Sequence, residues 1–205
     1  VYLGGVSGGS RLDGWIDEFR MSRAVLEPNQ FLTTASPNRS EYASLLVSMN
    51  GTPSETVVTV TNALNAGSFY GTAISFGTNG VMPTYANERV APVVYSRAVG
   101  GAAWTNASSI SFLGATESTS GGRLDIVDSA NTVCASNFTA ELFVKVRSLP
   151  SAGQVSTLLR KKNVRGTAWG LSMNASGALE TAFYTSNTLV MVYGTTPIFD
   201  TRWHH

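Results

Sequence analysis

Short runs of apolar residues at every second position, separated by turns rich in Gly, Asn and Pro, constrain this chain more than any other feature. A side chain that returns to the same face every second residue is the pattern of a half-buried β-strand. No stretch has a persuasive 3.6-residue period, so little helix is expected. Many short strands with such turns predict an all-β, antiparallel sandwich or barrel.

The strongest pattern lies at Leu12–Arg23. After Gly14, strict alternation assigns one face to Trp15, Asp17, Phe19 and Met21, and the other to Ile16, Glu18, Arg20 and Ser22. An ionised Asp17 among apolar side chains is unfavourable unless N–H groups, a cationic side chain or a metal ion satisfies it. Two interpretations stay open, a buried carboxylate held by loop amides and a calcium ligand.

Other strands are predicted along the rest of the chain, at residues 44–51, 56–61, 109–114, 122–128, 138–146, 155–161, 168–173, 178–184 and 189–193. Residues 62–108 are the least readable part, with only short apolar pieces at 73–76 and 92–95. In the strand that begins at Phe138, alternation separates an apolar face from a polar one that contains Glu141 and Lys145. Ile110 and Phe112 share a face, as do Leu124 and Ile126. The segment 82–85 is either an aromatic loop over a glycan site or a strand connection that packs on the sandwich edge.

Three motifs resemble laminin G-like, or concanavalin A-like, jelly-roll domains. Gly14–Arg20 resembles the closing Gly-x-Ile-Asp-Glu strand of that family, Asn137–Val146 its Phe-Thr-x-Glu strand, and Arg202–His205 the opening of its Trp-His-His strand. Residues 1–5 resemble the strand that enters the closing hairpin. The resemblance implies a jelly-roll sandwich and an inward-facing structural histidine near the Ile-Asp-Glu carboxylates.

The order of these motifs differs from that in the family, because here the closing strand comes first. We therefore expect residues 1–33 to be the closing strands of one laminin G-like jelly roll, and residues 34–205 the N-terminal part of a second that stops at its Trp-His-His strand. The boundary is predicted in the polar connector at residues 33–40. The alternative is a single permuted sandwich that uses both parts, since the termini of a domain often lie close together.

Composition excludes several classes of protein. The net charge is +1, and the sequence shows no basic run and no platform of aromatic and arginine residues, so nucleic acid is not an expected partner. No window of 18 apolar residues exists, so membrane insertion is not expected either. Cys134 is the only cysteine, which rules out an intrachain disulfide. Charged residues make up only 13% of the chain, and secreted eukaryotic relatives usually have a disulfide, so we predict an extracellular or cell-surface protein of a bacterium or archaeon.

The sequence predicts no enzyme. The two histidines are the last two residues, and no Gly-x-Ser-x-Gly motif is present. Glu141 and Glu180 could in principle form a glycosidase pair, but the spacing typical of glucanases of this fold is missing. Calcium is a possible cofactor, with Asp17, Asp125 and Asp128 as candidate ligands, or these residues are solvated or cap turns.

Two functions remain. The first is recognition of a glycan or a surface protein for adhesion, with stacking on exposed aromatic residues, for which the candidates are Trp104, Trp169, Tyr85 and Tyr184. The second is a structural one, in which the chain is a repeat unit of a fibre or surface layer. Neighbouring copies or domains of a longer chain would then complete one another by strand exchange.

Overall fold

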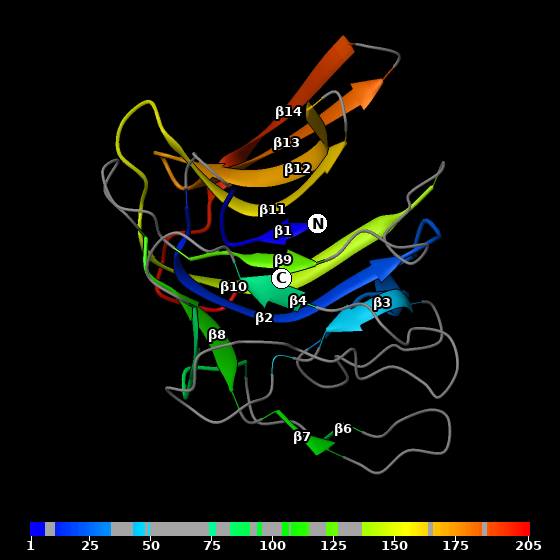
Figure 1. Ribbon diagram of the computed structural model, residues 1–205, viewed down its shortest axis with the longest axis vertical. Coiled ribbons are helices and arrows are strands. Elements are labelled where there is room, and N and C mark those ends of the chain that lie inside the picture. Colours follow the sequence, from blue (N-terminus) through cyan, green and yellow to red (C-terminus); the bar gives the residue numbers. More distant parts are fainter. Residues whose placement is uncertain are drawn as a thin grey trace.

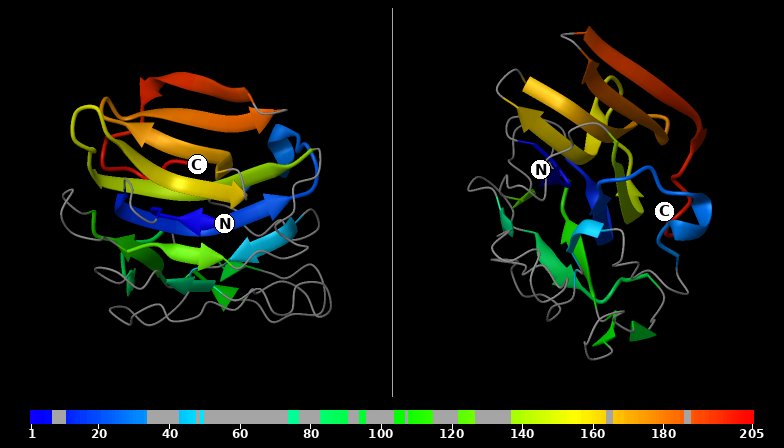
Figure 2. Two further views of the ribbon diagram at one scale, coloured as in Figure 1. Left: turned by 45° about the horizontal axis from the view of Figure 1, so that its top comes forward. Right: turned by 90° about the vertical axis from the view of Figure 1, so that its right-hand side faces the viewer.

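Two antiparallel sheets stacked face to face form the protein (Figures 1 and 2). The computed structural model describes residues 1–6, 11–33, 43–47, 49, 74–76, 83–90, 94–95, 104–106, 108–114, 122–126, 137–163, 166–185 and 188–205. Within these ranges the only helical segment is the 3₁₀ turn η1 (Pro28–Gln30). The predicted all-β antiparallel sandwich is therefore confirmed.

The larger sheet has seven strands in the order β14-β13-β12-β11-β1-β9-β4. Their bounds are β14 (Thr188–Pro197), β13 (Ala178–Thr185), β12 (Gly166–Asn174), β11 (Val155–Asn163), β1 (Tyr2–Leu3), β9 (Leu124–Ile126) and β4 (Ile74–Phe76). The run from β11 to β14 is a meander of consecutive hairpins. In the turn between β12 and β13, the Asn174 side chain accepts hydrogen bonds from the backbone N–H groups of Ser176 and Ala178. Gly177 completes this turn with a φ of +84°.

The smaller sheet has five strands, β10-β2-β8-β5 with β3 also paired to β2. Their bounds are β10 (Thr139–Ser148), β2 (Asp13–Ser22), β8 (Ser109–Phe112), β5 (Thr84–Ala86) and β3 (Ala43–Val47). A separate two-stranded ribbon joins β6 (Val94–Tyr95) to β7 (Trp104–Thr105). Among the described residues no helix is long and apolar enough to cross a bilayer.

The facing surfaces of the two sheets enclose one apolar core. Its members include the residues that alternation assigned to inner faces of β8, β9 and β10, namely Ile110, Phe112, Leu124, Ile126, Leu142, Val144 and Val146. The predicted apolar face of β10 is thus confirmed. Tyr85, expected in an aromatic loop or an edge connection, lies in strand β5 and belongs to this core.

Strand β2 departs from strict alternation at a β-bulge. Between the pairs Arg20↔Glu141 and Asp17↔Phe143, two residues of β2 lie opposite one residue of β10. Glu18 in this bulge has a φ of +47°, which non-glycine residues seldom adopt. Because of the extra residue, the side chains that follow the bulge point to the face opposite to the one that strict alternation predicts.

The bulge therefore changes which side chains of β2 share a face of the sheet. Ile16, Phe19 and Met21 all point into the core. Asp17 contacts loop residues on the opposite, outer face of the five-stranded sheet, and Trp15 packs there against Arg147. The prediction that Trp15 and Asp17 share a face with Phe19 and Met21 was therefore wrong.

Residues 1–33 are integral to both sheets. Strand β1 lies between β11 and β9, whereas β2 lies between β10 and β8, so these two segments do not form a hairpin with each other. Both pair with strands from residues 34–205 (Figure 1). Most of the predicted connector, residues 34–40, and the predicted strand at 56–61 lie outside the described residues.

Candidate functional site

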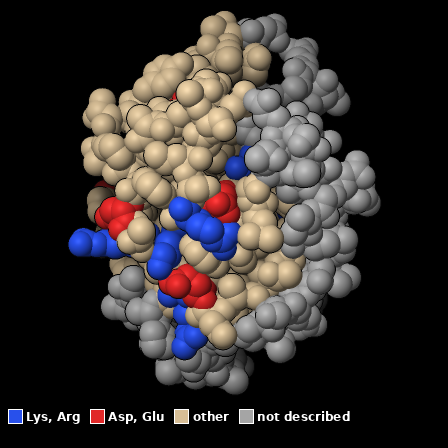
Figure 3. Space-filling view, turned by 90° about the vertical axis from the view of Figure 1, so that its left-hand side faces the viewer, with Lys and Arg blue, Asp and Glu red and all other residues tan. Residues whose placement is uncertain are grey.

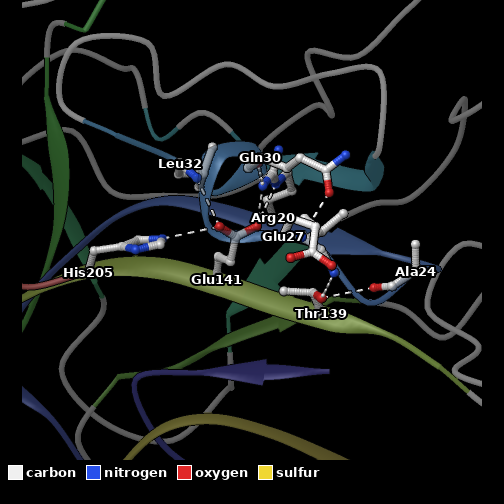
Figure 4. A network of polar contacts seen from close by, with 9 residues as sticks. Arg20, Ala24, Glu27, Gln30, Leu32, Thr139, Glu141 and His205 are labelled. Carbon is white, nitrogen blue, oxygen red and sulfur yellow. Dashed lines mark hydrogen bonds and ion pairs between the residues drawn. The ribbon is translucent and has the colours of Figure 1, made fainter.

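The outer face of the five-stranded sheet carries a buried ion pair between Arg20 of β2 and Glu141 of β10 (Figure 4). Arg20 is fully buried, and its Nε donates to Oε2 of Glu141 at 2.7 Å. The Nη2 group of Arg20 also donates to the Gln30 carbonyl at 2.7 Å, and the Leu32 N–H donates to Oε1 of Glu141 at 2.9 Å. The pair therefore fastens the loop after β2 onto the sheet.

His205 is the third side chain of this network. Its Nε2 lies 3.3 Å from Oε1 of Glu141, and its ring contacts those of Phe31 and Phe143. Burial by itself would raise the pKa of Glu141. Hydrogen bonds from His205, Leu32 and Arg20 outweigh burial and hold that pKa below its ordinary value. The resemblance placed a histidine near the Ile-Asp-Glu carboxylates, whereas the carboxylate that His205 contacts belongs to β10.

Asp17 forms a second buried polar centre on the same face. Its Oδ2 accepts hydrogen bonds from Nδ2 of Asn106 at 2.8 Å and from the Val90 N–H at 3.0 Å. The backbone N–H of Glu18 is a third donor. Burial raises the pKa of Asp17 to about 7, and these hydrogen bonds offset only part of that effect. The geometry matches the interpretation of a buried carboxylate held by loop amides.

The candidate calcium ligands do not converge. Asp17 lies on the five-stranded sheet, and Asp125 lies on the seven-stranded sheet, where Arg123 binds both of its carboxylate oxygens at 2.6 and 3.0 Å. Asp128 is outside the described residues. In the described ranges no three His, Cys, Asp or Glu side chains are grouped to hold a metal ion. Calcium binding stays a prediction.

The four aromatic residues proposed for stacking are scattered. Tyr85 and Trp169 are 8% and 7% exposed and belong to the core, where Trp169 packs against Phe138. Tyr184, at the end of β13, is 42% exposed. Trp104 lies in β7, which belongs to the separate two-stranded ribbon and not to either main sheet. Among the three candidates whose side chains the structure describes, Tyr184 is the exposed one.

Glu141 and Glu180 also lie apart, since Glu141 is on β10 of one sheet and Glu180 is on β13 of the other. On the face in Figure 3, positive and negative side chains lie next to one another across the middle of the view. Ion pairs on the five-stranded sheet include Arg147 with Asp13 at 2.6 Å and Lys145 with Glu88 at 2.9 Å.

A basic patch on the outer face of the seven-stranded sheet was missed by the sequence reasoning. The Tyr2 ring has the Arg123 guanidinium and the Lys162 ammonium each 5.7 Å from its centroid. Arg160 is the cross-strand partner of Tyr2, so both side chains point to the same face. Burial, and then repulsion by Arg123, lower the pKa of Arg11.

We call Tyr2, Arg11, Arg123, Arg160 and Lys162 the basic patch. The sequence analysis expected no platform of aromatic and arginine residues, whereas the structure brings such side chains together around Tyr2. Its members come from four separate segments that only the sheet brings together, so no local motif could have indicated it.

Strand β14 is the second feature that the site predictions left out. It is the last strand of the seven-stranded sheet, and among the described strands its only sheet partner is β13. None of its residues belongs to the apolar core as far as the structure describes it. Leu189, Val190, Val192 and Tyr193 are all exposed.

Comparisons of the chain with models of protein families, with curated proteins and with solved structures find no match to any of them. The two-sheet antiparallel architecture is compatible with a jelly roll.

Proposed function

We propose that this chain is a non-catalytic recognition module of the laminin G-like, or concanavalin A-like, kind, which binds an anionic glycan at a bacterial or archaeal cell surface. The observation that carries this proposal is the cluster of cations around the Tyr2 ring. Arg123 and Lys162 each lie 5.7 Å from its centroid. Arg160 is the cross-strand partner of Tyr2, and Arg11 lies close enough to Arg123 for the two to repel each other.

The basic patch has the two elements that an acidic sugar chain requires. An aromatic ring offers a flat apolar surface to the faces of sugar rings, and the cations beside it pair with sulfate or carboxylate groups. Because Arg11 and Arg123 repel each other, an anion bound between them would relieve that repulsion. The resemblance to lectin-like sandwiches favours a glycan over nucleic acid as the source of the negative charge.

Calorimetric titration with dextran sulfate, against neutral dextran of the same length, tests the proposal. We expect saturable binding of dextran sulfate that weakens as salt rises, because exposed charges are screened. Lys162→Ala should weaken it about fivefold, since a cation near an anionic surface contributes about 1 kcal/mol. Arg202→Ala is the matched control, because Arg202 is 83% exposed and lies outside the patch.

Three results would contradict the proposal. Equal losses in Lys162→Ala and Arg202→Ala would mean that net charge alone attracts the polymer. Saturable binding of neutral dextran would favour stacking on exposed aromatic residues such as Tyr184. Tighter binding of single-stranded DNA than of dextran sulfate at equal charge would make nucleic acid the partner.

A further inference from the structure

Strand β14 has an unusual composition for the edge of a sheet. Edge strands of soluble proteins are commonly protected by charged residues, proline or bulges, because their free N–H and C=O groups can pair with another chain. In β14 the run Leu189–Tyr193 is entirely apolar. From Gly166 to Phe199 the only charged residue is Glu180. The upper part of Figure 3, at the height of β12–β14 in Figure 1, is correspondingly almost free of charged side chains.

Both faces of β14 are apolar and open to solvent. The pairings Phe183↔Val190 and Ala182↔Met191 place Val190 and Met191 on opposite faces of the sheet. Val190 and Val192 share the face of the core residues, yet both are exposed because the core does not extend to β14. Six of the eight large exposed apolar residues in the described ranges lie between positions 184 and 199. Continuous apolar runs are typical of strands with neighbours on both sides.

We propose that β14 pairs antiparallel with β14 of a second copy of this chain, which joins two seven-stranded sheets into one across a two-fold axis. An antiparallel strand pair relates each strand to its partner by such an axis. A register centred on Met191 sets Leu189 against Tyr193 and Val190 against Val192 of the other copy. This is the register in which all five residues of the run meet apolar partners.

The charge of β14 argues for a second copy as the occupant. A charged edge would place like charges near each other across the two-fold axis, and like charges directly opposite in a sheet are destabilising. The strand Thr188–Pro197 has no charged residue, so self-pairing has no such penalty. Pairing through β14 is separate from the basic patch, and high salt should not weaken it, because apolar contacts are not screened.

Sedimentation velocity over a range of protein concentrations is the first test. We expect a reversible monomer–dimer equilibrium that persists in high salt and stops at the dimer, since a two-fold contact uses up the edge. Val192→Lys should weaken dimerisation at least about tenfold, because it puts two ammonium groups into an apolar strand pair. Val25→Lys is the matched control, since Val25 is 70% exposed and Val192 is 54% exposed.

A register test distinguishes this pairing from other dimers. In a Cys134→Ser background, Met191→Cys should form an intermolecular disulfide on mild oxidation, because residues directly opposite in an antiparallel pair are within disulfide range. Ser151→Cys, in an exposed turn, should not. Mixing Val192→Lys with Val190→Glu should restore dimers, because the register brings the new Lys opposite the new Glu.

Each of the following results would overturn the proposal. If the protein is monomeric at every concentration, β14 does not pair with a second copy and its partner is another protein. If open-ended polymers form, the contact is not two-fold. A dimer that Val192→Lys and Val25→Lys weaken equally would have its interface elsewhere. Circular dichroism and thermal unfolding of Val192→Lys establish that it is folded, and the cysteine test does not depend on that variant.

Discussion

Asp17 shows how burial decides the behaviour of a single residue. Its pKa is about 7 in the folded protein, against 3.8 in an exposed carboxyl, so the folded state binds a proton more tightly than the unfolded chain does. The resulting stabilisation is complete below pH 3.8 and is lost as the pH rises through 7. Asp17 therefore makes the protein less stable at pH 8 than at pH 5.

Asp17→Asn should remove this dependence on pH. The Oδ1 atom of Asp17 has no hydrogen-bond partner within the described structure, so the amide nitrogen fits there while the amide oxygen keeps the bonds from Asn106 and Val90. We expect the free energy of unfolding of the wild type to fall by on the order of 2 kcal/mol from pH 5 to pH 8, and that of Asp17→Asn to change much less. Urea unfolding at the two pH values measures this. Parallel losses in both proteins would assign the pH dependence to another group.

Glu141→Gln should be strongly destabilising, because it removes the carboxylate charge that pairs with the fully buried Arg20. Removing one partner of a buried ion pair typically costs about 3–5 kcal/mol. Glu180→Gln, on β13, is the control and should stay within about 0.5 kcal/mol of the wild type. Chemical denaturation gives both values. A small loss in Glu141→Gln would mean that the other contacts of Arg20, including the one with the Gln30 carbonyl, suffice to compensate its buried charge.

The bulge in β2 is the element that determines which side chains reach the core. Deleting Glu18 should convert the bulge into a regular ladder and leave Phe19 and Met21 facing inward. Inserting one alanine between Arg20 and Met21 should instead turn Met21 outward. We expect cooperative thermal unfolding in the deletion variant and loss of near-ultraviolet circular dichroism in the insertion variant. The opposite outcome would show that contacts of Glu18 itself hold the strand.

Strands β2 and β14 differ in their sheet partners and in how far their residues are buried. Strand β2 has sheet partners on both sides, and its residues from Ile16 to Ser22 are buried. In the part of the chain that the structure describes, β14 has one partner strand, and most of its residues are exposed. In dilute, monomeric protein, amide hydrogen exchange should therefore be slowest in β2 and fastest in β14. Mass spectrometry of exchanged peptides measures the difference. If the protection of β14 amides from exchange rises with protein concentration, β14 pairs in the dimer. If β14 amides in the monomer are as protected as those of β2, the structure is contradicted.

The sequence by itself determined the all-β class and the faces of β8, β9 and β10, because alternation is a local property that regular strands preserve. Only the tertiary structure decided the faces of β2, since a bulge exists only relative to the strand opposite it. The basic patch around Tyr2 likewise depends on neighbours that are distant in sequence, as does the Arg20–Glu141–His205 network. The apolar run of β14 was readable as a strand, but its position at the edge followed from the order of strands, which local patterns do not encode.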